Sequence, residues 1–404
     1  MSSMINLLSI VICSAIFLAI YHAAIYPLVL ILAGSFHDSK GGQDTTEAIR
    51  PGASHVEPPL VTVCVVAHNA QGHIEGCLRA ILEAEYPRDR LAVVVVSDAS
   101  TDGTDELVEA LEDPRVSLIR MPVRRGKTYA ENRVAPTLEG DIIVNTDATV
   151  QLERRAISAL VEAFTDQRVG AASGVDILAS SNDDPEYKYV GFEMWIRRLE
   201  TEAGGIVGNS GSIYAVRRFI HALTVPDHLS RDLASAFLTH QAGYRSVLVP
   251  QARCLISPTA SVRAEYYRKL RTSRRGIETL WHFKHLLNPF RHGIFSFKIW
   301  SHKVVRWLLP PLVLAMGPGS VLLASGSAPL LAWLIGMSWS ALLLFWILTI
   351  AVGESFRPQG GVLTTAYLGA GMLAGTVAWG KVVLAQGDGS WDPTPRPPLA
   401  GADP

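Results

Sequence analysis

Uncharged apolar residues fill the first 36 positions of the chain, which contain no Asp, Glu, Lys or Arg. The apolar run 5–33 exceeds the roughly 20 residues that a helix needs to cross a bilayer. It has neither the basic start nor the small-residue cleavage site of a signal peptide. We therefore predict a retained membrane anchor over 1–36, with a cleaved signal as the alternative.

Two further uncharged stretches lie toward the other end of the chain. The first, between Arg306 and Glu354, is long enough for two spans joined by a turn at 325–329, and the second covers 358–380. Buried core helices seldom reach such lengths. The pattern predicts about three transmembrane helices within 304–385, followed by a tail over 386–404.

The region between these runs has the composition of a soluble domain and starts with a polar, Gly- and Pro-containing linker over 37–59. From residue 60 onward, short apolar runs alternate with segments of helical spacing. Strands without a polar face, separated by helices, indicate a parallel sheet covered on both sides. We therefore predict an α/β domain with a doubly wound, mostly parallel sheet over 60–280. The expected strands are 60–67, 91–96, 116–120 and 141–145, and the expected helices are 74–82 and 104–111.

Composition narrows the class of protein. Hydrophobic residues make up 49% of the chain and charged residues 18%, against about 25% charged in a typical soluble domain. A wholly soluble protein is therefore disfavoured, and the 4 Cys and 33 Gly exclude a disulfide scaffold and a collagen-like chain. The cysteines show no CxxC spacing, which fits a reducing compartment. The net charge of -1 gives no indication of a nucleic-acid partner.

Basic residues gather in 263–306, where eleven Lys and Arg face only Glu265 and Glu278. An excess of Lys and Arg beside a span marks the cytoplasmic side. We therefore expect an integral protein of the bacterial inner (plasma) membrane with a cytoplasmic catalytic domain. The segment 281–303, in which basic residues alternate with phenylalanines, is expected to lie along the membrane interface.

Polar residues follow the ends of three predicted strands. His68 and Asn69 follow the first, Asp98 follows the second and Asp147 follows the fourth. Ligands of such folds bind at the carboxyl ends of the strands. Two carboxylates in one crevice repel each other unless they share a cation or a donor group, which suits a nucleotide with its metal. The local alternatives are an N-cap or Asx turn for Asp98 and a turn residue for Asp147.

Four segments contain these residues in order: VTVCVVAHNA, VVVVSDASTDGTDEL, GKTYAEN and DIIVNTDAT. Together they resemble the family 2 glycosyltransferases of the GT-A fold. Members of that family have an Asn at a strand end, a DxSxDGT turn, a GKxxALN segment and a DxD-type metal site. The resemblance covers 60–276, and the flanking spans are similar to those of the membrane-bound synthase branch. It implies an enzyme of the hexosyltransferase type.

The resemblance implies roles for donor-binding residues. His68 and Asn69 would line the nucleoside pocket, and Asp98 would accept a hydrogen bond from uracil. Lys127 would face the diphosphate, as its compact cation allows, and Asn132 matches the family's Asn.

The same resemblance implies a metal cofactor, Mg²⁺ or Mn²⁺, bound by Asp147. Thr149 stands where the family has the second acid of its DxD motif. A hydroxyl is a weaker ligand than a carboxylate for a hard cation. The metal would therefore rest mainly on Asp147, phosphate oxygens and water.

The segment GNSGSIYAVRR is similar to the acceptor-side loop of the family, which reads SGAxxAxRR. This match assigns Gly208, Ser210 and Gly211 to the acceptor side. Trp195, on a predicted helix over 189–202, either lines the acceptor cleft or belongs to the core.

Asp232 matches the family's catalytic base, which takes the proton of the acceptor hydroxyl. Arg231 replaces the acid that precedes the base in the family and is expected to hold Asp232 ionised. The alternative for Asp232 is the N-cap of a helix that begins at Leu233.

Three arginines, Arg271, Arg274 and Arg275, lie where the processive branch of the family has a QxxRW motif. They would stabilise the leaving diphosphate or bind anionic lipids. Since the Gln and Trp are absent, transfer of one or a few sugars is favoured over chain extension.

The sequence thus predicts a membrane-embedded inverting glycosyltransferase. It would move a sugar from a nucleotide-sugar, expected to be UDP-linked, to a lipid-linked or glycan acceptor in cell-envelope polysaccharide or glycolipid synthesis. Membrane lipids are expected partners and nucleic acid is not. The alternatives are a processive polysaccharide synthase and a catalytically weak nucleotide-binding subunit of a synthase complex.

Overall fold

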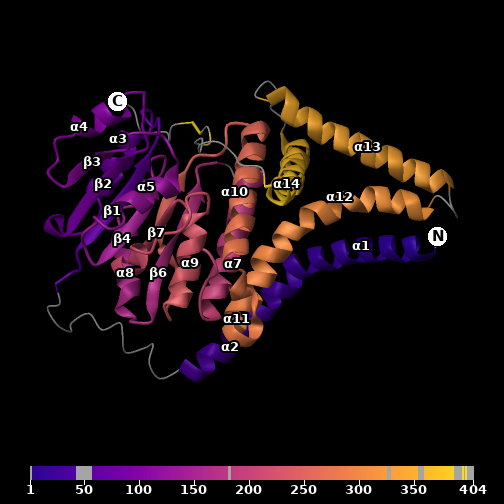
Figure 1. Ribbon diagram of the computed structural model, residues 1–404, viewed down its shortest axis with the longest axis horizontal. Coiled ribbons are helices and arrows are strands. Elements are labelled where there is room, and N and C mark those ends of the chain that lie inside the picture. The colour runs from indigo at the N-terminus through magenta and orange to yellow at the C-terminus, as the bar shows by residue number, and fades with distance from the viewer. Residues whose placement is uncertain are drawn as a thin grey trace. The chain divides into compact units, whose positions relative to one another are not determined.

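Two compact units make up the chain (Figure 1). The helical unit comprises 1–29, 183–186 and 259–387, and the sheet unit comprises 30–182, 187–258 and 388–404. The computed structural model describes residues 2–41, 57–180, 183–324, 329–353 and 359–385, together with Thr394, Arg396 and Pro397. Most of the predicted linker 37–59 and of the tail 386–404 lies outside the described residues.

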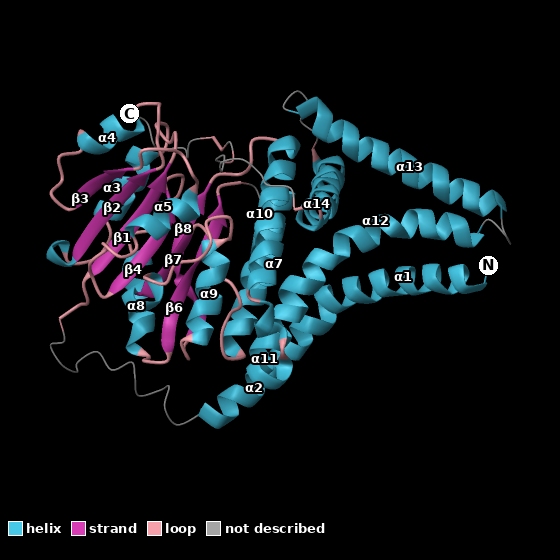
Figure 2. Ribbon diagram, viewed as in Figure 1, coloured by secondary structure: helices cyan, strands magenta, loops and turns pink. Residues whose placement is uncertain are grey.

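An eight-stranded mixed sheet forms the centre of the sheet unit (Figure 2). Its strand order is β3-β2-β1-β4-β7-β6-β8-β5. Strands β1 to β4 pair in parallel, β7 runs antiparallel to both of its neighbours, and β6 pairs in parallel with β8. The bounds are β1 (Val61–Ala67), β2 (Leu91–Ser97), β3 (Val116–Arg120), β4 (Ile142–Asp147), β5 (Gln151–Leu152), β6 (Val169–Leu178), β7 (Ile213–Arg217) and β8 (Arg245–Ile256).

Helices cover both faces of this sheet, as its apolar strands require. Alternate side chains of a strand point to opposite faces: Val63 and Val65 of β1 pack on one face with α3 and α6, whereas Cys64 and Val66 pack on the other with α5. The helices are α3 (Ile74–Leu82), α4 (Thr104–Glu109), α5 (Lys127–Val134), α6 (Ala156–Glu162), α7 (Pro185–Glu202), α8 (Arg218–His221) and α9 (Arg231–Gln241), with 3₁₀ turns η2 (Arg88–Arg90) and η3 (Ala163–Thr165).

The predicted doubly wound, mostly parallel α/β fold is confirmed. The helix expected over 74–82 has the same bounds in the structure, and β3 also begins and ends where expected. β4 extends two residues beyond the predicted end, so Asp147 is its last residue and does not follow it. Strands β5, β6, β7 and β8 were not predicted.

Gly174 lies at an irregularity in the pairing of β6 with β8. A Cβ atom at this position would lie 2.5 Å from Ile213 Cγ2 and 2.6 Å from the carbonyl oxygen of Ala252. Because the backbone carbonyl cannot move aside freely, Gly174→Ala is expected to destabilise the fold by about 1–3 kcal/mol. Thermal unfolding followed by circular dichroism tests this. Gly191→Ala is the matched control, since nothing lies within 4 Å of its added Cβ; equal midpoints for the two variants would contradict the prediction.

Within the described residues, four helical segments are long and apolar enough to cross a membrane, one near the N-terminus and three toward the C-terminus. They are Leu8–Ser35, Pro289–Ala324, Pro329–Val352 and Gly360–Val383. Their number and order agree with the sequence prediction. The underlying elements are α1 (Ser2–Ile20), η1 (Tyr21–Ile25), α2 (Tyr26–Gly41), α10 (Val262–His282), η4 (Lys284–Leu287), α11 (Pro289–Lys298), η5 (Ile299–Val304), α12 (Val305–Ala324), α13 (Pro329–Val352) and α14 (Gly360–Val383).

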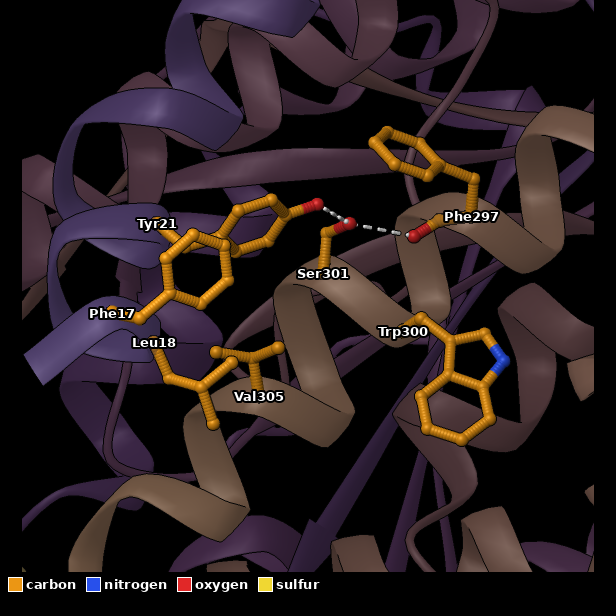
Figure 3. Close-up of a pocket in the computed structure, with 7 residues that line it drawn as sticks. All are labelled: Phe17, Leu18, Tyr21, Phe297, Trp300, Ser301 and Val305. Atoms are coloured by element: carbon orange, nitrogen blue, oxygen red, sulfur yellow. Dashed lines mark hydrogen bonds between the residues drawn. The ribbon is translucent and has the colours of Figure 1, made fainter. Parts of the chain in front are cut away.

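Two π-helical turns of the helical unit, η1 and η5, lie against each other (Figure 3). The Tyr21 hydroxyl bonds to Ser301 Oγ at 2.7 Å, and Ser301 donates to the carbonyl oxygen of Phe297 at 2.8 Å. Polar groups in an apolar segment must find partners within the protein, and these hydroxyls do so. An adjoining groove is mostly apolar; its lining residues are Phe17, Leu18, Tyr21, Phe297, Trp300, Ser301 and Val305. The predicted interfacial segment 281–303 is helical for most of its length and continuous with α12.

Candidate active site

Hydrogen bonds between side-chain oxygens and backbone N–H groups join the loops that follow β1 and β2. Asn69, just after β1, adopts a φ of 48°, a conformation that Asn tolerates better than most residues. Its Oδ1 accepts from the N–H of Thr101 at 2.8 Å, and its own N–H donates to Ser100 Oγ at 3.2 Å. The two loops at this edge of the sheet are therefore held as one surface.

Asp98 is fully buried directly after β2. Its carboxylate accepts from the N–H groups of Arg125 at 2.9 Å and Gly126 at 2.7 Å, while its carbonyl oxygen lies 2.8 Å from Nδ1 of the buried His68. Asp98 therefore shapes the turn that leads into α5, where Gly126 has a φ of 97°. The alternative that Asp98 is an N-cap is wrong, because the N-cap of α4 is Gly103. The predicted hydrogen bond to uracil stays a prediction.

Lys127 begins α5 and reaches across to two other elements. Its Nζ lies 2.5 Å from Asp147 Oδ1, at the end of β4, and 3.2 Å from the carbonyl oxygen of Gly211, before β7. Burial lowers the pKa of Lys127, but the Asp147 and Glu131 carboxylates raise it by more, so the pKa lies above its ordinary value. Lys127 is therefore a firmly protonated cation at the sheet edge.

Asp232 lies next to Gly211. A Cβ added to Gly211 would meet Asp232 Oδ2 at 3.2 Å, a close contact that would require the carboxylate to shift slightly. Asp232 is half-buried in the first turn of α9, and its Oδ1 accepts from Ser230. The N-cap residue of α9 is Ser230, so the alternative that Asp232 is the N-cap is wrong. The structure thus brings Lys127, Asp147 and Asp232 together around Gly211.

Arg231 pairs with Glu131 and not with Asp232, whereas the expectation that it holds Asp232 ionised stays a prediction. Its guanidinium donates to Asn132 Oδ1 and to the carbonyl oxygen of His221, and its Nε lies 4.0 Å from a Glu131 carboxylate oxygen. Asn132 Nδ2 donates to the carbonyl oxygen of Val225 at 2.6 Å. Both amide atoms of Asn132 are thus engaged inside the protein, between α5 and the loop before α9; its predicted donor contact stays a prediction.

The predicted acceptor-side loop packs against β6. Ser210 Oγ donates to Asp176 at 2.7 Å, and its N–H donates to Ser173 Oγ at 2.8 Å. Gly208 is buried beside it. Asn209 is buried too, and both polar atoms of its side chain lack a hydrogen-bond partner among the described residues.

Trp195 is 42% exposed on α7. The alternative that it belongs to the core is therefore wrong. Its ring lies 5.9 Å from that of Phe192, so α7 presents an aromatic pair.

The three arginines that were predicted to bind the diphosphate, Arg271, Arg274 and Arg275, lie on α10 in the helical unit. Arg274 is buried and pairs with Glu278 at 2.9 Å. Arg271 and Arg275 are partly buried. Their predicted approach to the diphosphate stays a prediction.

A divalent cation would find one carboxylate at this edge, since the Asp147 side chain is 35% exposed. Thr149 is half-buried in the turn after β4. In the described part of the chain, no group of three His, Cys, Asp or Glu side chains is placed to hold a metal. Mg²⁺ at phosphate sites commonly takes one or two carboxylates and completes its shell with phosphate oxygens and water. The residues therefore fit a cation that binds together with a diphosphate.

Glu131 and Asp176 were missed by sequence reasoning. Glu131 occupies the position of Leu in the GKxxALN pattern. This departure from the pattern was the one feature of the local sequence that could have indicated Glu131. Nothing in the local sequence around Asp176 indicated its contact with Ser210.

Residues 62–222 match the family model described as Glycosyl transferase family 2. The match contains every strand-end residue described above, and Asp232 follows it by ten positions. Residues 62–222 are therefore similar to the family 2 glycosyltransferases, and the resemblance predicted from the motifs is confirmed. The class of protein that this match indicates is the sugar transferases.

Two characterised-by-name relatives are similar to this chain in sequence. The beta-monoglucosyldiacylglycerol synthase of a Nostoc species is 27% identical over 168 residues, covering 40% of this chain and 36% of the relative. The N-acetylglucosaminyltransferase of Bradyrhizobium diazoefficiens is 25% identical over 316 residues, covering 72% of this chain and 63% of the relative. The chain thus spans about a third of the length of the first relatives it matches.

Among solved structures, the mannosyltransferase PcManGT from Pyrobaculum calidifontis, in complex with GDP-Man and Mn²⁺, superposes with a TM-score of 0.66. The match covers 93% of this chain and 100% of that chain at 23% identity. This likeness shows a shared fold, the GT-A fold with accompanying helices.

Proposed function

We propose that the protein is a membrane-embedded inverting glycosyltransferase that moves a sugar from a nucleotide-sugar to a lipid-linked or glycan acceptor. The observation that supports this most is the convergence of Lys127, Asp147 and Asp232 around Gly211. One side of this arrangement offers a cation and a metal-binding carboxylate, and the other offers a second carboxylate. A diphosphate leaving group and an attacking hydroxyl need these two kinds of group.

In this proposal the loops at β1 and β2 hold the nucleoside, and Lys127 meets the diphosphate. Mg²⁺ or Mn²⁺, bound through Asp147 and the diphosphate, would supply positive charge for the leaving group. Lys127 adds a fixed cation that needs no reorganisation during the reaction. It exchanges its contact with Asp147 for phosphate oxygens as the donor binds.

Asp232 is the general base of the proposed reaction. It takes the proton from the acceptor hydroxyl while that oxygen attacks the anomeric carbon, and the bond to the diphosphate breaks on the far side of the sugar. The absence of a side chain at Gly211 keeps a Cβ atom away from Asp232 Oδ2. Ser230 donates to Asp232 Oδ1, which leaves Oδ2 for the acceptor.

The proposed acceptor class follows from the membrane segments and the relatives. One relative is named a glycolipid synthase and another an N-acetylglucosaminyltransferase, so synthesis of cell-envelope glycolipid or polysaccharide is the proposed role. We favour a UDP-sugar donor and transfer of one or a few sugars. The basic residues of α10 and η5 support a cytoplasmic catalytic domain at the inner membrane.

A donor screen tests the proposal. The purified full chain in detergent is incubated with UDP- and GDP-sugars, Mg²⁺ or Mn²⁺ and a lipid extract, and released nucleoside diphosphate is measured. Release that depends on the extract supports transfer. A product of long polymer would favour the processive synthase, and no turnover of any donor would contradict an enzymatic role.

A nucleotide-binding subunit of a synthase complex is the second candidate, favoured by the replacement of the second metal-binding acid by Thr149. Isothermal titration with UDP and Mn²⁺ separates it from the enzyme. Tight binding without any sugar transfer would support the subunit.

A further inference from the structure

Glu131 is a buried carboxylate that the proposed chemistry does not yet use. It lies on α5, one turn after Lys127, and only 1% of it is exposed. One of its oxygens is 4.0 Å from Arg231 Nε and accepts no hydrogen bond among the described residues. Burial raises the pKa of Glu131 above its ordinary value, and the Asp147 and Asp232 carboxylates add to this shift, although Lys127 and Arg231 act in the opposite direction.

Arg231 stands in an unfavourable position for a cation. It is the first residue of α9 and only 6% exposed, so its charge is buried at the positive end of a helix. Its hydrogen bonds to Asn132 and the His221 carbonyl satisfy N–H groups but bring no negative charge. A buried charge without a countercharge is strongly destabilising, and the Glu131 carboxylate lies within ion-pair distance of Arg231.

The next residue along the chain is Asp232. Were Arg231 without Glu131, the carboxylate of the adjacent Asp232 would be an alternative countercharge. A guanidinium turned toward Asp232 would engage the oxygen atoms that the acceptor hydroxyl needs. The two departures from the family pattern, Glu131 in place of Leu and Arg231 in place of the acid, thus compensate each other in charge.

We propose that Glu131 is a positioning residue for the base Asp232: by balancing Arg231 it keeps the guanidinium directed at Asn132 and His221 and away from the reacting carboxylate. This inference rests on the proposed function. It assigns Glu131 to the chemical step and not to donor binding.

Other titratable groups facing this pair do not provide the balance. Burial raises the pKa of the Cys64 thiol to about 12 and raises that of Tyr214, so both are neutral near pH 7. Burial and Arg231 lower the pKa of His221, which is neutral too. The remaining charged groups are Lys127, which adds a cation, Asp147, which pairs with Lys127, and the base Asp232 itself, whose carboxylate the proposal leaves to the acceptor.

The first test is Glu131→Gln in the full chain. Loss of the negative charge leaves Arg231 uncompensated, which favours the ionised form of Asp232 and so lowers its pKa. We expect kcat to fall about tenfold, as for a weaker and partly blocked base, with the KM for the donor within twofold. In a plot of kcat against pH, the acid limb is expected to move to lower pH. Glu131→Asp, which keeps the charge, is expected to recover most of kcat.

Glu139→Gln is the matched control, because Glu139 is exposed just beyond α5; it is expected to leave kcat and the profile unchanged. A folded Glu131→Gln variant with wild-type kcat and an unmoved acid limb would overturn the inference while leaving the proposed function intact.

A second measurement does not depend on activity. Thermal midpoints of Glu131→Gln, Arg231→Met and the double variant form a mutant cycle. If the pair exists, the double variant loses less than the sum of the two single losses. Additive losses would overturn the inference even if no donor is turned over, whereas a coupled pair in an inactive protein would contradict only the proposed function.

Discussion

Asp232→Asn is expected to lower kcat about a thousandfold while leaving donor binding within a factor of two. An amide cannot take the proton of the acceptor hydroxyl, and general-base catalysis contributes about 10²–10⁴-fold. The amide keeps the size of the carboxylate and can still bond to Ser230, so the first turn of α9 should stay intact. Steady-state kinetics with nucleotide release, beside titration calorimetry with the nucleoside diphosphate, separate the two effects.

Asp89→Asn serves as the control for this variant, because the Asp89 side chain is 82% exposed. We expect wild-type kinetics from it. Asp232→Asn with kcat within fivefold of wild type would remove Asp232 from the role of base and, with it, the proposed mechanism.

Asp147→Asn is expected to have the second largest effect, about a hundredfold loss of kcat/KM, in the range found when one charge-stabilising group is removed. The amide is a poor ligand for a hard cation, and Asp147 is the carboxylate proposed to bind the metal. The loss should appear mainly as a higher KM for the donor and a higher concentration of Mg²⁺ or Mn²⁺ at half-saturation. Kinetics across a metal titration measure both.

This variant also leaves Lys127 without its carboxylate partner, so its fold must be checked by circular dichroism. Thr149→Asp provides a contrasting change, since it restores the second acid of the family's motif. We expect it to lower the metal concentration needed for activity. If Asp147→Asn shows unaltered metal dependence, the proposed metal site is wrong.

Local patterns account for the parts of the fold that were predicted correctly. The apolar runs of β1 to β4 and the helical spacing of α3 are properties of consecutive residues, and their type does not depend on distant contacts. The four apolar segments follow from length and lack of charge alone. Strands β6 and β8 escaped prediction because the first is rich in Gly and Ala, which have little β-propensity, and the second contains Pro250, which argues against a strand.

The candidate site, like the fold, was predicted from the sequence only in part. Sequence placed Asn69, Asp98 and Asp147 at strand ends, and parallel pairing of β1 with β2 and β4 then brings them to one edge. The partners of Asp98 could not be read from the sequence, because they are N–H groups of a turn 27 and 28 residues away.

By itself, then, the sequence determined the order of apolar spans, the α/β core and the family that the domain resembles, since these depend on composition and on motifs of neighbouring residues. Only the tertiary structure decided that Arg231 turns toward Glu131 and Asn132 and not toward Asp232, and that Lys127 joins Asp147 to the loop at Gly211. The physical reason is that a buried charge takes the countercharge that packing brings near it, and that choice depends on how α5 and α9 meet across about a hundred residues of chain.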